Sequence, residues 1–302
     1  MERKLQMANV KTYQTQTVNI PQNFPAQQQP QQPGSQQEMA PKPVTDNPNY
    51  KGSGKMKDLV AIITGGDSGI GQAVAAAFAK EGANIVIAYY SEQEDASETV
   101  RMVESAGRQC IAIKCDLKKE ESAAQVVNET IKKFGRLDVL VNNIAVQFPQ
   151  NSIEDITTEQ LYNTFETNII SYFFMTRAAL PHMKEGGSII NTTSVTAYKG
   201  NPTLIDYSST KGAVVSFTRS LALSLAQRGI RVNAVAPGPV WTPLITSSMT
   251  EQTVQNFGKD VPLGRAAQPF EMAPTYVYLA CDDSAYVTGQ VLHVNGGTIV
   301  ES

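Results

Sequence analysis

Seven short apolar runs alternate with helical patterns from residue 59 onward, and this alternation limits the possible folds more than any other feature. The first run covers residues 59–64 and the last covers 291–294. Between the runs, apolar residues recur at the three- and four-residue spacing of amphipathic helices. Strands that alternate with helices form parallel sheets, because each helix returns the chain to the edge where the next strand begins. The sequence therefore predicts an α/β fold, a doubly wound seven-stranded parallel sheet with helices on both faces.

The expected elements fill a single domain over residues 55–302, with no internal repeat and no second domain. Its expected strands cover residues 59–64, 84–90, 109–114, 137–141, 188–194, 231–236 and 291–294. Its expected helices cover residues 70–80, 93–105, 118–134, 158–183, 207–228 and 269–280.

Residues 1–50 differ in composition from the rest of the chain. They contain Gln/Pro-rich runs such as QQQPQQP at residues 27–33. Such a segment buries too little apolar area to offset the entropy lost on ordering. Two interpretations stay open: a flexible tail, or an extended arm that lies on a neighbouring subunit. In the second case Tyr13, Ile20 and Phe24 are the candidate anchors.

Glycines cluster directly after the first strand, in residues 64–71 with the sequence TGGDSGIG. In doubly wound folds of the Rossmann type, a dinucleotide pyrophosphate binds between the first strand and its helix. Gly65 allows the tight turn there, Gly69 lets the backbone approach a phosphate, and Gly71 permits close packing of the helix. Free N–H groups at the start of the helix attract the anion. The loop therefore predicts a Rossmann-type domain that binds a dinucleotide.

Tyr207 and Lys211 are four residues apart at the start of a helical pattern that follows strand 188–194. Positions i and i+4 lie on one face of a helix, so the two side chains project together. The ammonium group of Lys211 favours a phenolate, and we expect it to lower the Tyr207 pKa from its ordinary value near ~10. The pair is a candidate for proton transfer, although the YxxxK pattern alone is common.

Together, the TGGDSGIG loop, Tyr207 and Lys211 resemble the short-chain dehydrogenase/reductase family, and the resemblance covers about residues 55–302. Within the family, the sequence of the loop and the Gln/Pro-rich extension resemble those of bacterial stress-associated oxidoreductases similar to glucose/ribitol dehydrogenases. Two positions depart from the usual pattern: NNIA stands at 142–145 where the family has NNAG, and Asn295 stands where Asp is frequent. The other matching elements are CDL at residues 115–117, PGPVWT at 237–242, and YVTGQ at 286–290 followed by VNGG at 294–297.

The resemblance implies a catalytic set of Asn168, Ser194, Tyr207 and Lys211. Tyr207 is the general acid in reduction and the general base in oxidation. Lys211 lowers the pKa of Tyr207 and bonds the nicotinamide ribose. Ser194 holds the substrate carbonyl or hydroxyl, and Asn168 places a water that relays protons. The expected cofactor contacts are Gly65, Asp67, Ser68, Gly69, Ile70, Gly71, Tyr90, Asp116, Leu117, Asn143, Ala145, Thr193, Tyr207, Lys211, Pro237, Gly238, Val240 and Thr242.

The choice between NAD and NADP depends on the end of the second strand, which reads YYSE at residues 89–92. An acidic group there accepts from the adenosine ribose, whereas an Arg receives the extra phosphate of NADP. The strand tip has neither group, and Ser68 rather than a cation precedes Gly69. Glu92 is within reach of the ribose. The missing cations favour NAD, with NADP as the alternative.

Composition narrows the partners further. The net charge is −3 with no basic block, which argues against nucleic acid, and no apolar run approaches the ~20 residues of a membrane helix. The odd number of three cysteines, with no CxxC pair, and the lack of a signal-peptide core favour the cytoplasm. With only His182 and His293 in the chain, no metal site is expected. The family resemblance implies a homotetramer.

Two functions compete with an oxidoreductase that acts on a secondary alcohol, sugar, polyol or matching carbonyl. A ketoacyl-thioester reductase needs a basic patch at the mouth of the site, and the expected flap over residues 242–265 offers only Lys259 and Arg265. A non-catalytic dinucleotide-binding sensor predicts a damaged catalytic set, whereas all four residues are present here. The substrate itself does not follow from the sequence, since pocket contacts rather than the fold determine it.

Overall fold

Seven strands form one parallel sheet in the computed structural model, which describes residues 18, 20–21 and 23–300. Their order is β3-β2-β1-β4-β5-β6-β7, so the predicted seven-stranded parallel sheet is confirmed. The order reverses between β1 and β4, the point at which doubly wound sheets bind ligands beyond the carboxyl ends of their strands. The strands are β1 (Val60–Thr64), β2 (Asn84–Tyr89), β3 (Cys110–Lys114), β4 (Val139–Asn142), β5 (Ser188–Thr192), β6 (Arg231–Pro237) and β7 (Val291–Val294).

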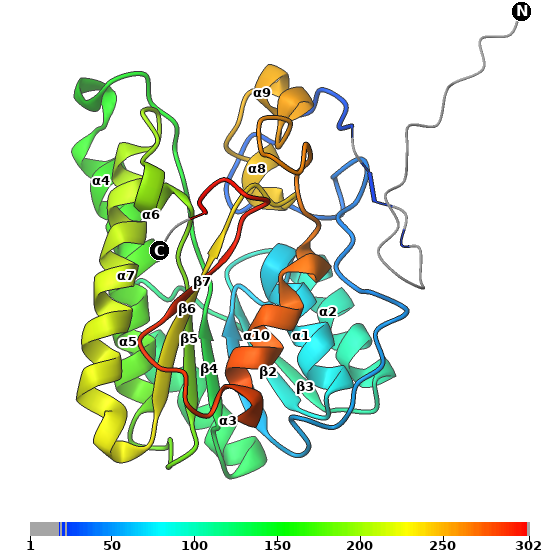
Figure 1. Ribbon diagram of the computed structural model, residues 1–302, viewed down its shortest axis with the longest axis vertical. Helices are drawn as coiled ribbons and strands as arrows, with labels where there is room; N and C mark the ends of the chain where they lie inside the picture. Colours follow the sequence, from blue (N-terminus) through cyan, green and yellow to red (C-terminus); the bar gives the residue numbers. More distant parts are fainter. Residues whose placement is uncertain (1–17, 19, 22, 301–302) are drawn as a thin grey trace, which may run out of the picture.

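Helices cover both faces of this sheet (Figure 1). Alternate residues of β1 show the two layers: Ala61 and Ile63 pack with α1, α2 and α10, while Ile62 packs with α3, α5 and α7. Both faces of a parallel strand are therefore apolar, as expected when helices bury each of them. The covering helices are α1 (Gly69–Lys80), α2 (Gln93–Ser105), α3 (Glu120–Phe134), α5 (Ser171–Ala179), α7 (Ile205–Leu225) and α10 (Ala273–Ala280).

The long helix predicted over residues 158–183 is interrupted. It consists of α4 (Thr158–Phe165), a π-helical segment over Glu166–Ile170 and α5, which ends at Ala179. A π-helical turn widens the helix by one residue and is frequent at functional sites. Asn168 lies inside this segment and is fully buried. Apolar periodicity did not reveal the interruption, because it continues through both halves of the helix.

The described part of the N-terminal extension lies on the domain of its own chain, a placement that neither of our two interpretations included. Residues 23–50 run over the flap, the phosphate loop and α1 without regular secondary structure (dark blue in Figure 1). The ring of Phe24 stacks on that of Trp241 with centroids 3.8 Å apart. Trp241 also donates its indole N–H to Pro41 O at 2.9 Å. Of the other two named anchors, Ile20 is half-buried and Tyr13 lies outside the described residues.

The flap follows β6 and contains two short helices, α8 (Pro243–Thr246) and α9 (Glu251–Asn256). Its apolar core consists of Trp241, Ile245, Val254 and Ala266, and the extension completes that core with Phe24 and Met39. Because the flap alone buries few apolar residues, the extension supplies part of what holds it in place.

Two negative findings apply to the described residues only. None of their helices is both long and apolar enough to cross a bilayer. Nor do they contain a group of three or more His, Cys, Asp or Glu side chains arranged to hold a metal ion.

Candidate active site

A cavity of about 970 Å³ opens beyond the carboxyl ends of the strands, at the point where the strand order reverses. The phosphate loop, the ends of β2, β4, β5 and β6, and the flap form its walls, and residues 32–34 of the extension complete them. Of the residues expected to bind the cofactor or act in catalysis, all except Gly71 and Asn168 line this cavity. The fold therefore gathers residues that are up to 177 positions apart in sequence, from Gly65 to Thr242. Their roles stay predictions at this point.

The phosphate loop has the backbone shape that a dinucleotide requires. Gly65 has φ +62° and Gly69 has φ +51°, which are left-handed conformations that favour glycine. A Cβ atom on Gly71 would lie 1.9 Å from Gly65 O, so Gly71 allows α1 to pack against the loop rather than lining the cavity. The first amides of a helix have no helical acceptor and attract anions. The N–H of Gly69 donates to a side chain of the extension, so the amides that follow it at the start of α1 are the candidates to meet a pyrophosphate.

Gln36 of the extension holds this loop, and no sequence motif pointed to it. Its Oε1 accepts the N–H of Gly69 at 2.9 Å, and its Nε2 donates to Gln72 Oε1 at 2.7 Å. Its own N–H donates to Asp95 Oδ2 at 2.7 Å. Gln36 is 5 % exposed, so these bonds form away from water. The extension therefore contributes a buried side chain that orders the phosphate loop.

We expect Gln36→Ala to weaken dinucleotide binding by roughly 3- to 10-fold, because the two buried side-chain hydrogen bonds that order the loop are lost. Titration of the protein with reduced dinucleotide, followed by fluorescence, measures the Kd. Gln28→Ala is the matched control, since Gln28 is an exposed glutamine of the same segment. Equal Kd values for the two variants would contradict the role of Gln36.

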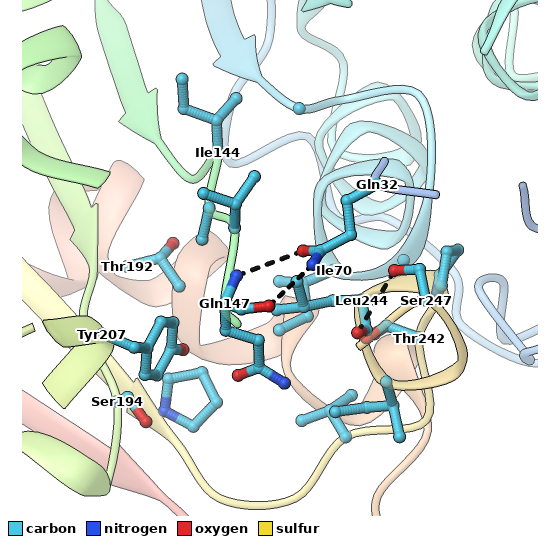
Figure 2. A pocket seen from close by; sticks show the side chains of 18 of the residues that line it. Gln32, Ile70, Ile144, Gln147, Thr192, Ser194, Tyr207, Thr242, Leu244 and Ser247 are labelled. Atoms are coloured by element: carbon cyan, nitrogen blue, oxygen red, sulfur yellow. Dashed lines mark hydrogen bonds between the residues drawn. The ribbon is translucent and has the colours of Figure 1, made fainter. Parts of the chain in front are cut away.

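Tyr207 and Lys211 project together from the first turns of α7, as their spacing predicted. Lys211 Nζ lies 5.5 Å from the centre of the Tyr207 ring and donates to Thr192 O at 2.9 Å. The Ser194 hydroxyl lies beside the Tyr207 side chain (Figure 2) and accepts the N–H and the hydroxyl of Thr196, both at 3.1 Å. The side chains of Ser194, Tyr207 and Lys211 are all buried. Figure 2 shows Tyr207 and Ser194 next to each other at the wall of the cavity.

Burial governs the pKa of both groups on α7. It raises the pKa of Tyr207 to about 12, with the hydrogen bond from Ser194 acting in the opposite direction. It lowers the pKa of Lys211 to about 7. The expected lowering of the Tyr207 pKa is therefore wrong for this structure. The reason is that the loss of hydration disfavours the buried phenolate, and above pH 7 the buried Lys211 is largely uncharged.

Asn168 has all the polar atoms of its side chain occupied. Its Oδ1 accepts Val146 N–H at 2.8 Å, and its Nδ2 donates to Val146 O at 2.9 Å and to Thr210 Oγ1 at 3.2 Å. The side chain thus ties the π-helical segment to α7 and to the loop after β4. Placement of a water by Asn168 stays a prediction.

Asn143 joins three strand ends around the phosphate loop. Its Nδ2 donates to Thr64 O and Gly65 O, both at 3.2 Å, and its Oδ1 accepts from Thr192 Oγ1 at 3.2 Å. The side chain therefore fixes the ends of β1, β4 and β5 relative to one another. It lies at the cavity wall, but its own polar atoms are engaged with the protein.

Three carboxyl groups gather near the end of β2. Burial, with smaller contributions from the nearby Glu92 and Asp95, raises the pKa of Asp67 to about 7. Burial also raises the pKa of Asp95 above its ordinary value. Asp67 and Glu92 both line the cavity. Acidic side chains therefore form part of the wall at this end of the cavity.

Comparison with known proteins identifies relatives over nearly the whole chain. The family model described as enoyl-(acyl carrier protein) reductase matches residues 65–298. General stress protein 39 of Bacillus subtilis is 55% identical over 94% of this chain and 99% of its own length. NADPH-dependent aldehyde reductase 1 of Arabidopsis thaliana is 54% identical over 91% of this chain and 98% of its own length. Glucose and ribitol dehydrogenase of Daucus carota is 51% identical over 92% of this chain and 97% of its own length.

Solved structures agree with these relatives. A short-chain dehydrogenase from Burkholderia cenocepacia in complex with NADP superposes with a TM-score of 0.75 at 29% identity, over 80% of this chain and 98% of that one. A short-chain dehydrogenase from Mycobacterium paratuberculosis bound to NAD gives a TM-score of 0.74 at 33% identity, with the same coverage of both chains. Sequence and structure therefore lead to one assignment. This chain belongs to the short-chain dehydrogenase/reductase family of NAD(P)-dependent oxidoreductases.

Proposed function

We propose that the protein transfers a hydride between a nicotinamide dinucleotide and a secondary alcohol, a sugar or polyol, or the matching carbonyl compound. The observation that carries this proposal is that Tyr207 and Ser194 are buried next to each other (Figure 2) and line the same cavity as the phosphate loop. The names of two relatives, a glucose and ribitol dehydrogenase and an aldehyde reductase, support the substrate class.

In the proposed reduction, the nicotinamide supplies the hydride that adds to the carbonyl carbon. Ser194 donates a hydrogen bond to the carbonyl oxygen and holds it beside Tyr207. Tyr207 then transfers its phenolic proton to that oxygen, so that the carbonyl becomes a hydroxyl. Its raised pKa keeps the proton on the phenol until negative charge develops on the substrate. Lys211, four residues along α7, favours the phenolate that remains.

We propose NAD as the preferred cofactor, with NADP as the alternative. The carboxyl groups of Asp67 and Glu92 in the cavity wall support NAD, because they repel the extra phosphate of NADP. Lys118 also lines the cavity, but its Nζ is bonded to Asn163 Oδ1 at 3.1 Å. A relative named as NADPH-dependent supports the alternative, so the two cofactors must be compared directly.

A spectrophotometric screen at about 340 nm tests the proposal, because only the reduced nicotinamide absorbs in this band. Sugars, polyols and aldehydes are assayed with both NAD and NADP. We expect turnover of at least one hydroxylated substrate, with kcat/KM about 10-fold or more higher for NAD because of the carboxylates near the ribose. Binding of the dinucleotide without turnover of any substrate would instead support the non-catalytic sensor.

A ketoacyl-thioester reductase stays the alternative enzyme. It needs cations that attract an acidic carrier protein to the mouth of the cavity. Arg265 of the flap forms a two-bonded pair with Glu271, with both N–O distances 2.7 Å, so this guanidinium is already neutralised within the protein. Turnover of a carrier-bound thioester in preference to sugars and aldehydes would select this alternative.

We also propose a cytoplasmic homotetramer. Three free cysteines support the reducing compartment. Exposed apolar side chains on the outer helices support an assembly, since the surfaces of monomeric proteins rarely expose several large apolar groups together. They are Leu161, Tyr162, Ile170, Phe173 and Leu223. Light scattering coupled to size-exclusion chromatography gives the subunit number, and a monomeric mass would refute the tetramer.

A further inference from the structure

The loop after β4 is held by two carboxamide side chains that come from different parts of the chain. Asn168 bonds both the N–H and the C=O of Val146. Gln32 of the extension does the same for the next residue, Gln147, with its Oε1 3.2 Å from the N–H and its Nε2 2.7 Å from the C=O. Figure 2 shows the pair of bonds between Gln32 and Gln147. Two successive peptide groups are thus fixed in a segment that has no secondary structure of its own.

The side chain of Gln147 lies in the cavity and is only 3 % exposed. Its Nε2 donates to Ser248 Oγ of the flap at 2.8 Å. The single hydroxyl hydrogen of Ser248 is directed to Leu244 O at 2.5 Å, so Ser248 accepts from Gln147 rather than donating to it. These hydrogen bonds determine the orientation of the Gln147 carboxamide, with Nε2 directed to the flap and Oε1 directed away from it.

The Oε1 atom of Gln147 has no hydrogen-bond partner among the residues that the structure describes. Figure 2 shows the Gln147 side chain extending into the part of the cavity that Tyr207 and Ser194 also face. A carboxamide oxygen is purely an acceptor, so its natural partner is the O–H of a ligand. The atom is not fully enclosed, so a ligand that enters the cavity can reach it and replace the water that it would otherwise bind.

We propose that Gln147 is a specificity-determining residue that accepts a hydrogen bond from a hydroxyl group on a carbon next to or near the reacting carbon, and that Gln32 positions it. The inference rests on the proposed function and narrows its substrate class to hydroxylated carbonyl compounds and polyols. Simple carbonyl compounds leave Oε1 unpaired and are therefore poorer substrates. The N-terminal extension thereby takes part in substrate recognition through Gln32, besides its contact with the phosphate loop.

Glyceraldehyde and propanal are the probe pair, because both are three-carbon aldehydes and only the first carries hydroxyl groups. We expect the wild-type protein to prefer glyceraldehyde by roughly 10- to 100-fold in kcat/KM. In Gln147→Leu, which keeps the bulk but removes the acceptor, this ratio falls toward one. Gln147→Glu keeps an acceptor and retains most of the preference. The Kd of the dinucleotide stays within about 3-fold of wild type in all of these variants, since the phosphate loop is untouched.

The role of Gln32 has its own matched variants. Gln32→Ala lowers the glyceraldehyde preference part of the way, mainly through KM, because the Gln147 main chain is no longer held. Gln31→Ala changes an exposed neighbour of the same segment, and Gln150→Leu changes a glutamine of the same loop outside the cavity. Both controls keep the wild-type ratio. An unchanged ratio in Gln147→Leu, or identical ratios in Gln32→Ala and Gln31→Ala, would overturn the proposal.

A binding measurement separates this inference from the proposed function. Trp241 is the only tryptophan of the chain, and its neighbours Val240 and Thr242 line the cavity, so its fluorescence reports occupancy independently of turnover. Failure of every aldehyde and alcohol to turn over would refute the proposed function. Even then, the ratio of the Kd values for glyceraldehyde and propanal, measured in the presence of oxidised cofactor, tests the role of Gln147. A binding preference for glyceraldehyde that disappears in Gln147→Leu supports this role. Equal binding of the two aldehydes by the wild-type protein overturns it.

Discussion

Tyr207→Phe is expected to lower kcat by roughly 10²- to 10⁴-fold, the usual contribution of a positioned general acid or base. The substitution removes one oxygen atom from a fully packed side chain and leaves the ring in place. That oxygen belongs to the side chain that lies beside Ser194 (Figure 2) and is the group proposed to protonate the substrate. Because the ring is retained, the shape of the cavity and the binding of the dinucleotide should change little. Steady-state kinetics with the best substrate of the screen measures the effect.

Dinucleotide titration and a matched tyrosine make this result specific. The Kd of Tyr207→Phe for the dinucleotide is expected within about 3-fold of wild type, since no loop residue is altered. Tyr162→Phe serves as the control, because Tyr162 is 63 % exposed on α4 and lies outside the cavity. Full activity of Tyr207→Phe would refute the assignment of Tyr207. A parallel loss of activity and dinucleotide binding would indicate damage to the site rather than loss of a proton donor.

The parts of this protein that could be predicted from sequence are those with a local signature. Alternating apolar runs predicted the parallel sheet, because each strand buries both faces and therefore reads as a short apolar stretch. The glycines of the phosphate loop and the spacing of Tyr207 and Lys211 encode backbone and helix geometry directly. These features depend on residues that are close in sequence, so the pattern alone carried most of the information.

The parts that were missed depend on contacts between distant segments. Gln36 and Gln32 lie in a low-complexity run, where nothing distinguishes them from their exposed neighbours Gln28 and Gln31. Their roles follow from partners such as Gly69 and Gln147, the latter 115 residues from Gln32. Composition indicated a poor core-forming segment, but buried amide hydrogen bonds rather than apolar area hold much of it in place.

The pKa of Tyr207 was mispredicted for a related reason. The position of Lys211 followed correctly from the helical spacing. In water, a charged ammonium group does lower the pKa of a nearby phenol. Its influence was overestimated because sequence does not reveal the depth of burial. Both side chains are more than 90 % buried, and the cost of removing charge from water then exceeds the attraction between the two groups.

Lys211→Met is expected to abolish turnover and, at the same time, to stabilise the protein at neutral pH. Lys211 is 1 % exposed, and burial alone lowers its pKa from 10.5 to about 7. A methionine of similar length removes the buried charge without leaving a large cavity. Thr192 O loses the Lys211 ammonium but keeps the hydroxyl of Tyr172, 3.3 Å away, as a donor. We expect a gain of about 1–3 kcal/mol in the free energy of unfolding at pH 6.5.

The dependence of this gain on pH gives the decisive measurement. Between pH 7 and 10.5 the unfolded wild-type chain binds a proton at Lys211 that the folded chain has released, so wild-type stability rises with pH across this window. Below pH 7 both states are protonated and this group adds no further slope. The advantage of Lys211→Met should therefore be largest at or below pH 7 and shrink toward pH 10 in urea unfolding experiments. Lys133→Met, on the exposed surface of α3, provides the control with no such trend. An advantage of Lys211→Met that is absent at pH 6.5, or that grows with pH, would show that Lys211 is not destabilised by burial.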